Sequence, residues 1–209
     1  MLKRPDISKF HYLTQEIPEI SHVALAEIAC SYGIRWVQLR VKEKSYQDWL
    51  EIARATKQVC DDYDAVLIIN DSVEIAKEVN AHGVHLGKQD MSVEQARSLL
   101  GINKIIGATA NTLEDIEYLE TMRVDYIGLG PFRFTTTKKN LASVIGFSGY
   151  EYIAKQYHGD IPIIAIGGVG LEDIKPLLIT GVYGVAVSSA VNLSTNKQED
   201  IAQFLNSII

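Results

Sequence analysis

Short apolar segments alternate with amphipathic segments along the whole chain, and this alternation constrains the fold more than any other feature. Eight apolar segments have the character of strands, at residues 11–14, 36–40, 66–70, 83–86, 104–108, 124–129, 163–166 and 182–187. Helices are predicted after them at residues 21–32, 45–63, a short segment ending at 79, then 92–100, 112–122, 149–157, 171–179 and 197–209. Ser45 is a plausible N-cap for the second of these helices.

The strands are expected to be parallel and covered on both faces. Residues 66–69 and 163–166 are apolar at consecutive positions, which is typical of parallel strands. The 209 residues, 47% of them hydrophobic, suffice for one sizeable core. The sequence therefore predicts an α/β fold, a single-domain (β/α)₈ TIM barrel over residues 1–209. A doubly wound open sheet is the alternative, but its Gly-x-Gly-x-x-Gly turn does not follow the first strand.

Composition argues against several classes of partner. The net charge is −6, and no run of Lys or Arg is long enough to follow a nucleic-acid backbone. No segment approaches the roughly 18 apolar residues of a membrane span, and the first ten residues lack the apolar region of a signal peptide. Cys30 and Cys60 lie in predicted helices among apolar neighbours, so we expect reduced, buried thiols. These features predict a protein of the cytoplasm.

The second strand ends in a group of basic residues. A period of two places Gln38, Arg40 and Lys42 on one face, where an amide, a guanidinium and an ammonium point the same way. Two cations at a barrel rim repel each other unless an anion lies between them, so the group favours an oxyanion ligand. The alternative is a pair of solvated basic residues matched by Glu43 and Asp48.

Carboxylates follow the next two strands. The third strand ends in Asn70 and Asp71, and Asp90 follows the fourth. Neighbouring parallel strands lie about 5 Å apart, so the two carboxylates can approach each other. Beside an anion-binding group, such a pair predicts a divalent cation, Mg²⁺ with a diphosphate being the commonest case. The alternative for each aspartate alone is an N-cap of the following helix.

Small and hydroxyl-bearing residues follow the later strands. Gly128 and Gly130 leave the backbone bare before Thr135, Thr136, Thr137 and Lys138, a density of donors that suits a phosphate ester. The alternative is a polar surface loop. Further candidates at strand ends are Thr109, Gly167, Gly168, Ser188 and Ser189. The last four follow the seventh and eighth strands, where many barrels bind phosphate.

Histidines contribute little to the expected chemistry. His85 lies between Val84 and Leu86 inside the fourth strand, where a hydrogen-bonded core residue is the favoured interpretation and a catalyst the alternative. His11, His22, His82 and His158 lack the spacing of metal ligands, which argues against a zinc site.

Together these segments resemble the thiamine-phosphate synthase family, also called thiamine-phosphate pyrophosphorylase, from about residue 12 to 191. The matching pieces, each at a strand end, are Gln38-Leu-Arg-Val-Lys42, Ile69-Asn-Asp71, Gly83-Val-His-Leu-Gly-Lys-Gln-Asp90, Ile106-Gly-Ala-Thr109, Gly128-Leu-Gly-Pro131 through Thr135-Thr-Thr-Lys138, Ala165-Ile-Gly-Gly168 and Val187-Ser-Ser-Ala190. No single piece is decisive, but their order is highly specific.

The resemblance implies an enzyme that joins 4-amino-2-methyl-5-(diphosphooxymethyl)pyrimidine to 4-methyl-5-(2-phosphooxyethyl)thiazole, giving thiamine phosphate and diphosphate. Transferred by position, the pyrimidine diphosphate would be held by Gln38, Arg40, Lys42, Asn70, Thr109 and Lys138, and the thiazole phosphate by Thr135, Thr137, Gly168, Ser188 and Ser189. Asp71 and Asp90 would hold one Mg²⁺ per subunit, with Mn²⁺ left open. Arg40, Lys42 and Lys138 would act in catalysis by stabilising the leaving diphosphate. The resemblance also implies a homodimer.

Three residues depart from the family pattern. Val41 stands where Glu is usual, Thr109 where Ser is usual, and Asn111 where His is common nearby. Strand alternation directs Val41 away from Arg40, so we expect it to affect the neighbouring loops rather than the chemistry.

Other functions stay open at this point. A thiazole tautomerase on the same barrel is the first alternative, although it has no use for a diphosphate-binding cluster. A non-catalytic phosphate-ligand sensor and an unrelated sugar-phosphate isomerase are the others, and the isomerase needs a base for which only His85 is a candidate.

Overall fold

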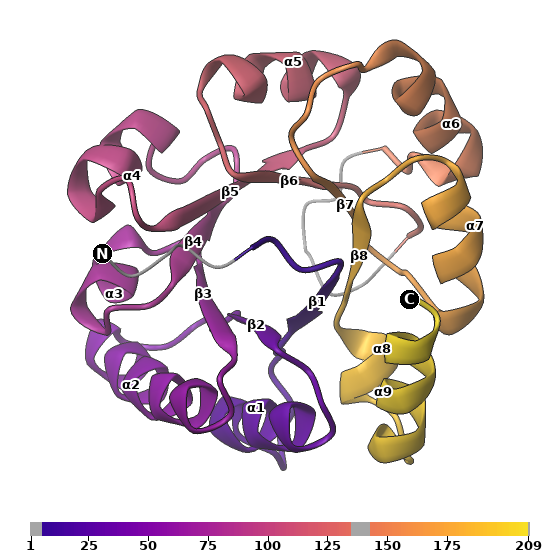
Figure 1. The fold of residues 1–209 in the computed structure, drawn as a ribbon. Helices are drawn as coiled ribbons and strands as arrows, with labels where there is room; N and C mark the ends of the chain where they lie inside the picture. The colour runs from indigo at the N-terminus through magenta and orange to yellow at the C-terminus, as the bar shows by residue number, and fades with distance from the viewer. Residues whose placement is uncertain (1–5, 135–142, 209) are drawn as a thin grey trace.

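The structure, a computed structural model, describes residues 6–134 and 143–208. Within these residues eight parallel strands follow one another in chain order around a closed barrel (Figure 1). The strands are β1 (Phe10–Leu13), β2 (Trp36–Leu39), β3 (Val66–Asn70), β4 (Gly83–Leu86), β5 (Ile105–Ala110), β6 (Tyr126–Leu129), β7 (Ile163–Ile166) and β8 (Gly184–Val187). The predicted (β/α)₈ TIM barrel is confirmed, and the doubly wound sheet is excluded because β1 pairs with β8.

Helices surround the strands on the outside of the barrel (Figure 1). They are α1 (His22–Ser31), α2 (Tyr46–Asp62), α3 (Val73–Glu78), α4 (Val93–Leu100), α5 (Leu113–Thr121), α6 (Gly146–Gln156), the 3₁₀ turn η1 (Leu171–Asp173), α7 (Ile174–Ile179), α8 (Ser189–Asn192) and α9 (Lys197–Asn206). Ser45 is the N-cap of α2, as predicted, and its hydroxyl accepts the backbone N–H of Asp48.

Several predicted boundaries are wrong by a few residues. Helix α6 begins at Gly146 rather than at residue 149, and the predicted helix at 171–179 divides into η1 and α7. Strand β5 continues to Ala110, so Thr109 lies within the strand and not at its end. Helix α8 was not predicted, because four residues are too short to show helical periodicity.

The side chains form two apolar layers. Alternate strand residues fill the interior of the barrel, and the opposite residues pack between strands and helices. The interior layer consists of Leu13, Trp36, Ile68, Ile105, Tyr126, Ile164 and Ala186. Val41 belongs to the outer layer and is 2% exposed, so it faces away from the interior, as strand alternation predicts. A carboxylate at position 41 would be buried among apolar side chains, which gives a packing reason for valine here.

Aromatic rings brace the interior near the amino-terminal ends of the strands. His11 stacks on Trp36 with ring centroids 4.3 Å apart and meets Tyr126 edge-on at 5.0 Å. Burial lowers the pKa of His11 to about 3, and its Nε2–H donates to the carbonyl of Ser8 at 2.9 Å. His11 is therefore a neutral packing residue.

Gly107 makes room for the ring of Tyr126, and replacing it with alanine is expected to destabilise the barrel. A Cβ atom at this position would overlap the Tyr126 ring, which is fully enclosed. Overpacking of this kind costs about 1–3 kcal/mol, measurable as a lower midpoint of urea unfolding. Gly101→Ala is the comparison, because its Cβ would meet nothing within 4 Å and only the positive φ of 82° is strained. Equal losses in both variants would contradict the packing explanation.

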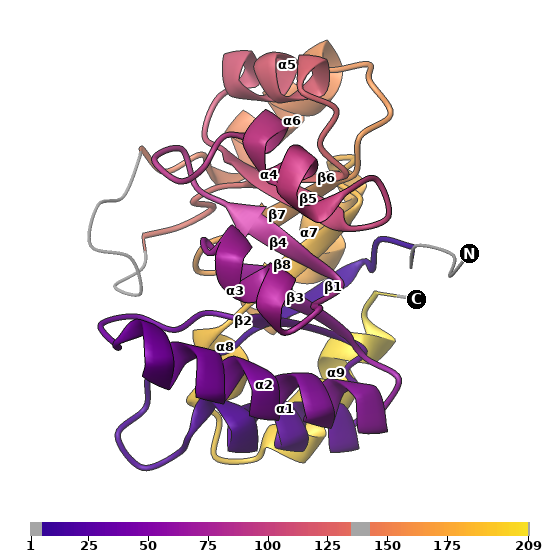
Figure 2. The ribbon, with the colours of Figure 1, turned by 90° about the vertical axis from the view of Figure 1, so that its left-hand side faces the viewer.

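The ends of the described chain lie at one side of the barrel. The indigo start of β1 and the yellow segment after α9 both lie on the right-hand side of Figure 2.

Cys30 and Cys60 are buried and free, as predicted. In the described parts of the chain, no helix is long and apolar enough to cross a membrane.

Candidate active site

Arg40 and Lys42 immediately follow β2, and two residues of the β1–α1 loop fix their backbone. The hydroxyl of Thr14 accepts the N–H of Arg40 at 3.1 Å, and Oε1 of Glu16 accepts the N–H of Lys42 at 2.9 Å. His22 holds both partners, with Nδ1 2.8 Å from the Thr14 hydroxyl and Nε2 3.0 Å from Oε2 of Glu16. The two cations therefore project from a braced segment rather than from a loose loop.

The two aspartates meet as predicted. The carboxyl groups of Asp71 and Asp90 lie within hydrogen-bonding reach of each other, and Lys42 forms an ion pair with Oδ2 of Asp71. The pKa of Asp90 is raised, first by the partial withdrawal of its carboxyl from water and then by the charge of Asp71. Its Oδ2 also accepts the N–H of Gly87 at 2.6 Å. Two carboxyl groups in such contact favour either a shared proton or a cation between them.

Neither aspartate caps a helix, so that alternative is wrong. Ser72 caps α3 and Ser92 caps α4, each accepting a backbone N–H with its hydroxyl. Asp71 instead has a left-handed backbone with φ of 68°. A residue other than glycine rarely adopts this conformation, and such strain is often found at functional sites.

Arg40 lies close enough to Asp71 and Glu16 for their charges to affect its pKa. Partial burial lowers the pKa of its guanidinium, while the carboxylates of Asp71 and Glu16 favour the charged form. Gln38 is 3% exposed and its side chain hydrogen-bonds the hydroxyl of Tyr126, so it lies deeper than Arg40. Of the three residues predicted to share a face, Gln38 therefore lies in the interior of the barrel, whereas Arg40 and Lys42 lie nearer the rim.

His85 is held on both ring nitrogens, as the core interpretation predicts. Nδ1 lies 3.0 Å from the Tyr126 hydroxyl and Nε2 lies 3.0 Å from the Thr109 hydroxyl. A Cβ atom at Gly128 would come within 2.9 Å of Cε1 of His85, so this glycine keeps room for the imidazole. Thr109, predicted to bind diphosphate, thus contacts His85 through its hydroxyl.

The loops after β6 and β7 are joined along their backbones. Phe132 donates its N–H to Ile166 and Arg133 donates to Gly167, both at 2.8 Å. Gly167 and Gly168 both have positive φ, 97° and 70°. Asn111 donates from Nδ2 to the carbonyl of Gly130 at 2.5 Å. The residue that departs from the family pattern at 111 therefore supports the start of the β6 loop.

Three predicted ligands lie beyond this point of the loop. Thr135, Thr137 and Lys138 are outside the described residues, so their proposed roles stay predictions.

The hydroxyls after β8 lie beside the β1–α1 loop. Ser188 and Ser189 donate to Oε1 of Gln15 at 3.1 and 3.3 Å. The buried Asn192 donates to the carbonyl of Leu13 at 2.8 Å and accepts the hydroxyl of Tyr12. These contacts join the short helix α8 to β1 and bring the two serines to the same rim as Arg40.

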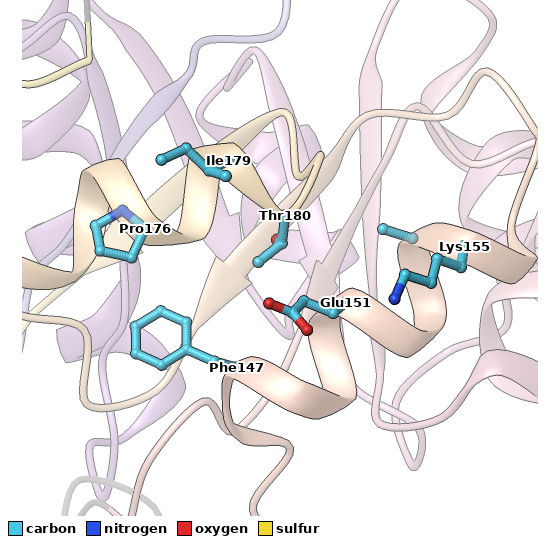
Figure 3. Close-up of a pocket in the computed structure, with 7 residues that line it drawn as sticks. Phe147, Glu151, Lys155, Pro176, Ile179 and Thr180 are labelled. Atoms are coloured by element: carbon cyan, nitrogen blue, oxygen red, sulfur yellow. The ribbon is translucent and has the colours of Figure 1, made fainter.

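A surface groove on the barrel wall is not part of this site. Figure 3 shows it between α6 and α7, where Phe147 and Glu151 face Ile179 and Thr180. Its lining comes from the helices and not from the carboxyl ends of the strands. Across residues 6–134 and 143–208, no group of three or more His, Cys, Asp or Glu side chains could hold a metal ion.

The sequence matches a known family over most of its length. The family profile described as thiamine monophosphate synthase matches residues 12–191. The chain belongs to the thiamine monophosphate synthase family. A thiamine-phosphate synthase of Bacteroides fragilis is 42% identical over 93% of this chain and 97% of its own length. One from Flavobacterium johnsoniae is also 42% identical, over 94% of each chain.

Solved structures agree with this family assignment. Thiamine phosphate pyrophosphorylase from Pyrococcus furiosus superposes with a TM-score of 0.83 and 31% identity, over 96% of this chain and 95% of that one. A structure described as native KDPGal has a TM-score of 0.76 at 12% identity, which shows the shared fold alone. The family and enzyme class predicted from the sequence are confirmed.

No sequence motif indicated the residues that support the candidate active site. Thr14, Gln15, Glu16 and His22 precede or begin α1, and none belongs to a motif that pointed to chemistry. Only the polarity of the segment after β1 could have indicated them, since that strand ends at the same rim.

Proposed function

We propose that this protein condenses 4-amino-2-methyl-5-(diphosphooxymethyl)pyrimidine with 4-methyl-5-(2-phosphooxyethyl)thiazole to form thiamine phosphate and diphosphate. The observation that carries the proposal is the cluster of Arg40, Lys42, Asp71 and Asp90 at one rim. Two cations beside two carboxylates suit a diphosphate accompanied by a divalent cation. The relatives of this chain, a thiamine-phosphate synthase and a thiamine phosphate pyrophosphorylase, are named for the same reaction class.

The proposed diphosphate site has a mixed charge pattern for a physical reason. Asp71 and Asp90 would hold Mg²⁺, because carboxylate oxygens are its usual protein ligands. When bound, the ion neutralises part of the diphosphate charge. Arg40 would form parallel hydrogen bonds to phosphate oxygens, and Lys42 would exchange its ion pair with Asp71 for the diphosphate. Gln38, Asn70, Thr109 and Lys138 complete the proposed set.

The proposed reaction needs no covalent nucleophile. The bond between the pyrimidine methylene carbon and the diphosphate oxygen breaks, and its electron pair leaves with the diphosphate. The electron-rich aminopyrimidine stabilises the resulting carbocation, and the lone pair of the thiazole nitrogen forms the new C–N bond. Arg40, Lys42 and Lys138 would stabilise the charge that develops on the leaving group, while Gly168, Ser188, Ser189, Thr135 and Thr137 would hold the thiazole phosphate.

Two broader expectations accompany this function. We propose that the protein acts in the cytoplasm as a single barrel domain, and the contact between the free thiols of Cys30 and Cys60 is compatible with a reducing compartment. The homodimer implied by the family resemblance stays a prediction.

The test is an endpoint assay with both substrates and Mg²⁺, scored for thiamine phosphate with and without a chelator. We expect product that disappears when the chelator is present and returns with excess Mg²⁺. Folded protein that binds the thiazole phosphate but forms no product would favour the sensor or tautomerase alternatives. Product that resists the chelator would support the reaction and contradict the proposed metal.

A further inference from the structure

Arg133 and Asp173 form an ion pair that joins the loop after β6 to the loop after β7. Nη1 of Arg133 pairs with Oδ2 of Asp173, and the same carboxylate oxygen accepts the N–H of Gly170 at 2.8 Å. The Asp173 side chain is 2% exposed, whereas that of Arg133 is 45% exposed. A polar group buried to this degree needs partners to replace the water that it loses, so the contact with Arg133 is part of what stabilises this carboxylate in the interior.

The Arg133 side chain is also fixed from the other direction. Its guanidinium lies over the ring of Phe132, with Cζ 4.7 Å from the ring centroid. Phe132 is 1% exposed and packs edge-on against Phe147 at 4.8 Å and Tyr150 at 5.9 Å, both on α6. Arg133 therefore connects the start of α7, through Asp173, with the aromatic cluster under α6.

The segment that carries Arg133 packs against the two glycines that follow β7, Gly167 and Gly168. A Cβ atom at Gly167 would lie 2.8 Å from Cα of Pro131, and one at Gly168 would lie 3.0 Å from Cβ of Arg133. The backbone of Arg133 also donates to the carbonyl of Gly167. The glycine turn is thus bounded on one side by residues 131–134 and at its far end by Asp173.

We propose that Arg133 and Asp173 are positioning residues that fix the Gly167–Gly168 turn in the conformation that binds the phosphate of the thiazole substrate. The inference rests on the proposed function, because it concerns the thiazole phosphate half of that site. Left-handed glycines are intrinsically mobile, so a turn built from two of them needs external constraints to present its N–H groups in one geometry. The ion pair supplies such a constraint by joining the loops on the two sides of the turn.

The test compares four variants with the wild type: Arg133→Ala, Arg133→Lys, Asp173→Asn and the double variant R133A/D173N. In Arg133→Ala we expect the KM for the thiazole phosphate to rise about tenfold, while the KM for the pyrimidine diphosphate changes less than about twofold. Arg133→Lys should restore most of the loss. The double variant removes the buried charge, so it should recover thermal stability but keep the raised KM.

Arg97→Ala is the matched control. Arg97 pairs with the 8% exposed Asp125 at 2.7 Å, a similar ion pair that precedes β6 at the opposite end of the strand. It should lower the melting temperature and leave both KM values unchanged. Equal changes in both KM values for Arg133→Ala, or recovery of KM in the double variant, would reduce the pair to a general stabilising role and overturn the proposal.

Calorimetric binding of the thiazole phosphate to the same variants separates this proposal from the proposed function. Wild-type turnover tests the reaction, whereas the dissociation constant tests the glycine turn without turnover. Weaker binding to Arg133→Ala but not to Arg97→Ala supports the positioning role even in an inactive preparation. If the preparation is active and Arg133→Ala binds the thiazole phosphate as tightly as the wild type does, the positioning role is contradicted.

Discussion

Replacing Asp71 with asparagine is expected to reduce kcat/KM by about 10³-fold, because catalytic metal ions contribute several kcal/mol of charge stabilisation. The substitution removes the carboxylate that contacts both Lys42 and Asp90. Asparagine has nearly the same shape and tolerates the left-handed backbone with φ of 68°. The loss should therefore come from the charge and not from a change of fold. Initial rates over a Mg²⁺ titration measure it.

Asp61→Asn is the control for this prediction. Asp61 pairs with Lys57 one turn earlier on α2, and the Asp61 side chain is 47% exposed. Such a pair contributes little to stability, so activity and Mg²⁺ dependence should match the wild type. Full activity of Asp71→Asn at the ordinary Mg²⁺ concentration would remove Asp71 from the proposed metal site.

The barrel could be predicted from the sequence because its signal is repeated. Strands such as Val66–Asn70 and Ile163–Ile166 are apolar at consecutive positions, and each is followed by an amphipathic helix. Boundaries were less predictable, since local chemistry decides them. Helix α6 begins three residues before the predicted position, and its N-cap, Ile145, makes no side-chain hydrogen bond that could have marked the start.

The approach of Asp71 and Asp90 was predictable from strand adjacency alone, but the alternative roles of these residues were not decided by sequence. Each precedes a helix in a manner that a capping residue would share. Ser72, one residue after Asp71, and Ser92, two residues after Asp90, are the N-caps of α3 and α4 instead. Capping depends on backbone geometry within one residue, which periodicity does not determine.

The bracing residues were hidden for a different reason. The Glu16 side chain accepts the backbone N–H of Lys42 across 26 positions of the chain, and the Asn192 side chain donates to the Leu13 carbonyl across 179 positions. Hydrogen bonds between side chain and distant backbone leave no spacing pattern in a single sequence. Closure of the barrel creates them, because it brings β8, β1 and β2 together.

Arg40→Ala is expected to reduce kcat/KM by about 10²- to 10³-fold, with Arg40→Lys retaining part of the activity. Charged hydrogen bonds aimed at a developing negative charge are worth roughly 3–4 kcal/mol in similar sites. Lysine keeps the charge but loses the planar fork that binds two phosphate oxygens together. Because the backbone of Arg40 is held by Thr14, the alanine variant should keep its loop in place.

Arg54→Ala is the control for Arg40→Ala, because it also removes one guanidinium group. Arg54 lies 57% exposed on α2 and pairs with Glu78 at 3.6 Å, so its removal should leave both substrates' KM values unchanged. The informative comparison is between kcat and the two KM values in Arg40→Ala. A fall in kcat with a raised KM for the pyrimidine diphosphate alone would place Arg40 on the leaving group. A selective rise in the thiazole phosphate KM would instead assign Arg40 to the second substrate and exchange the two proposed subsites.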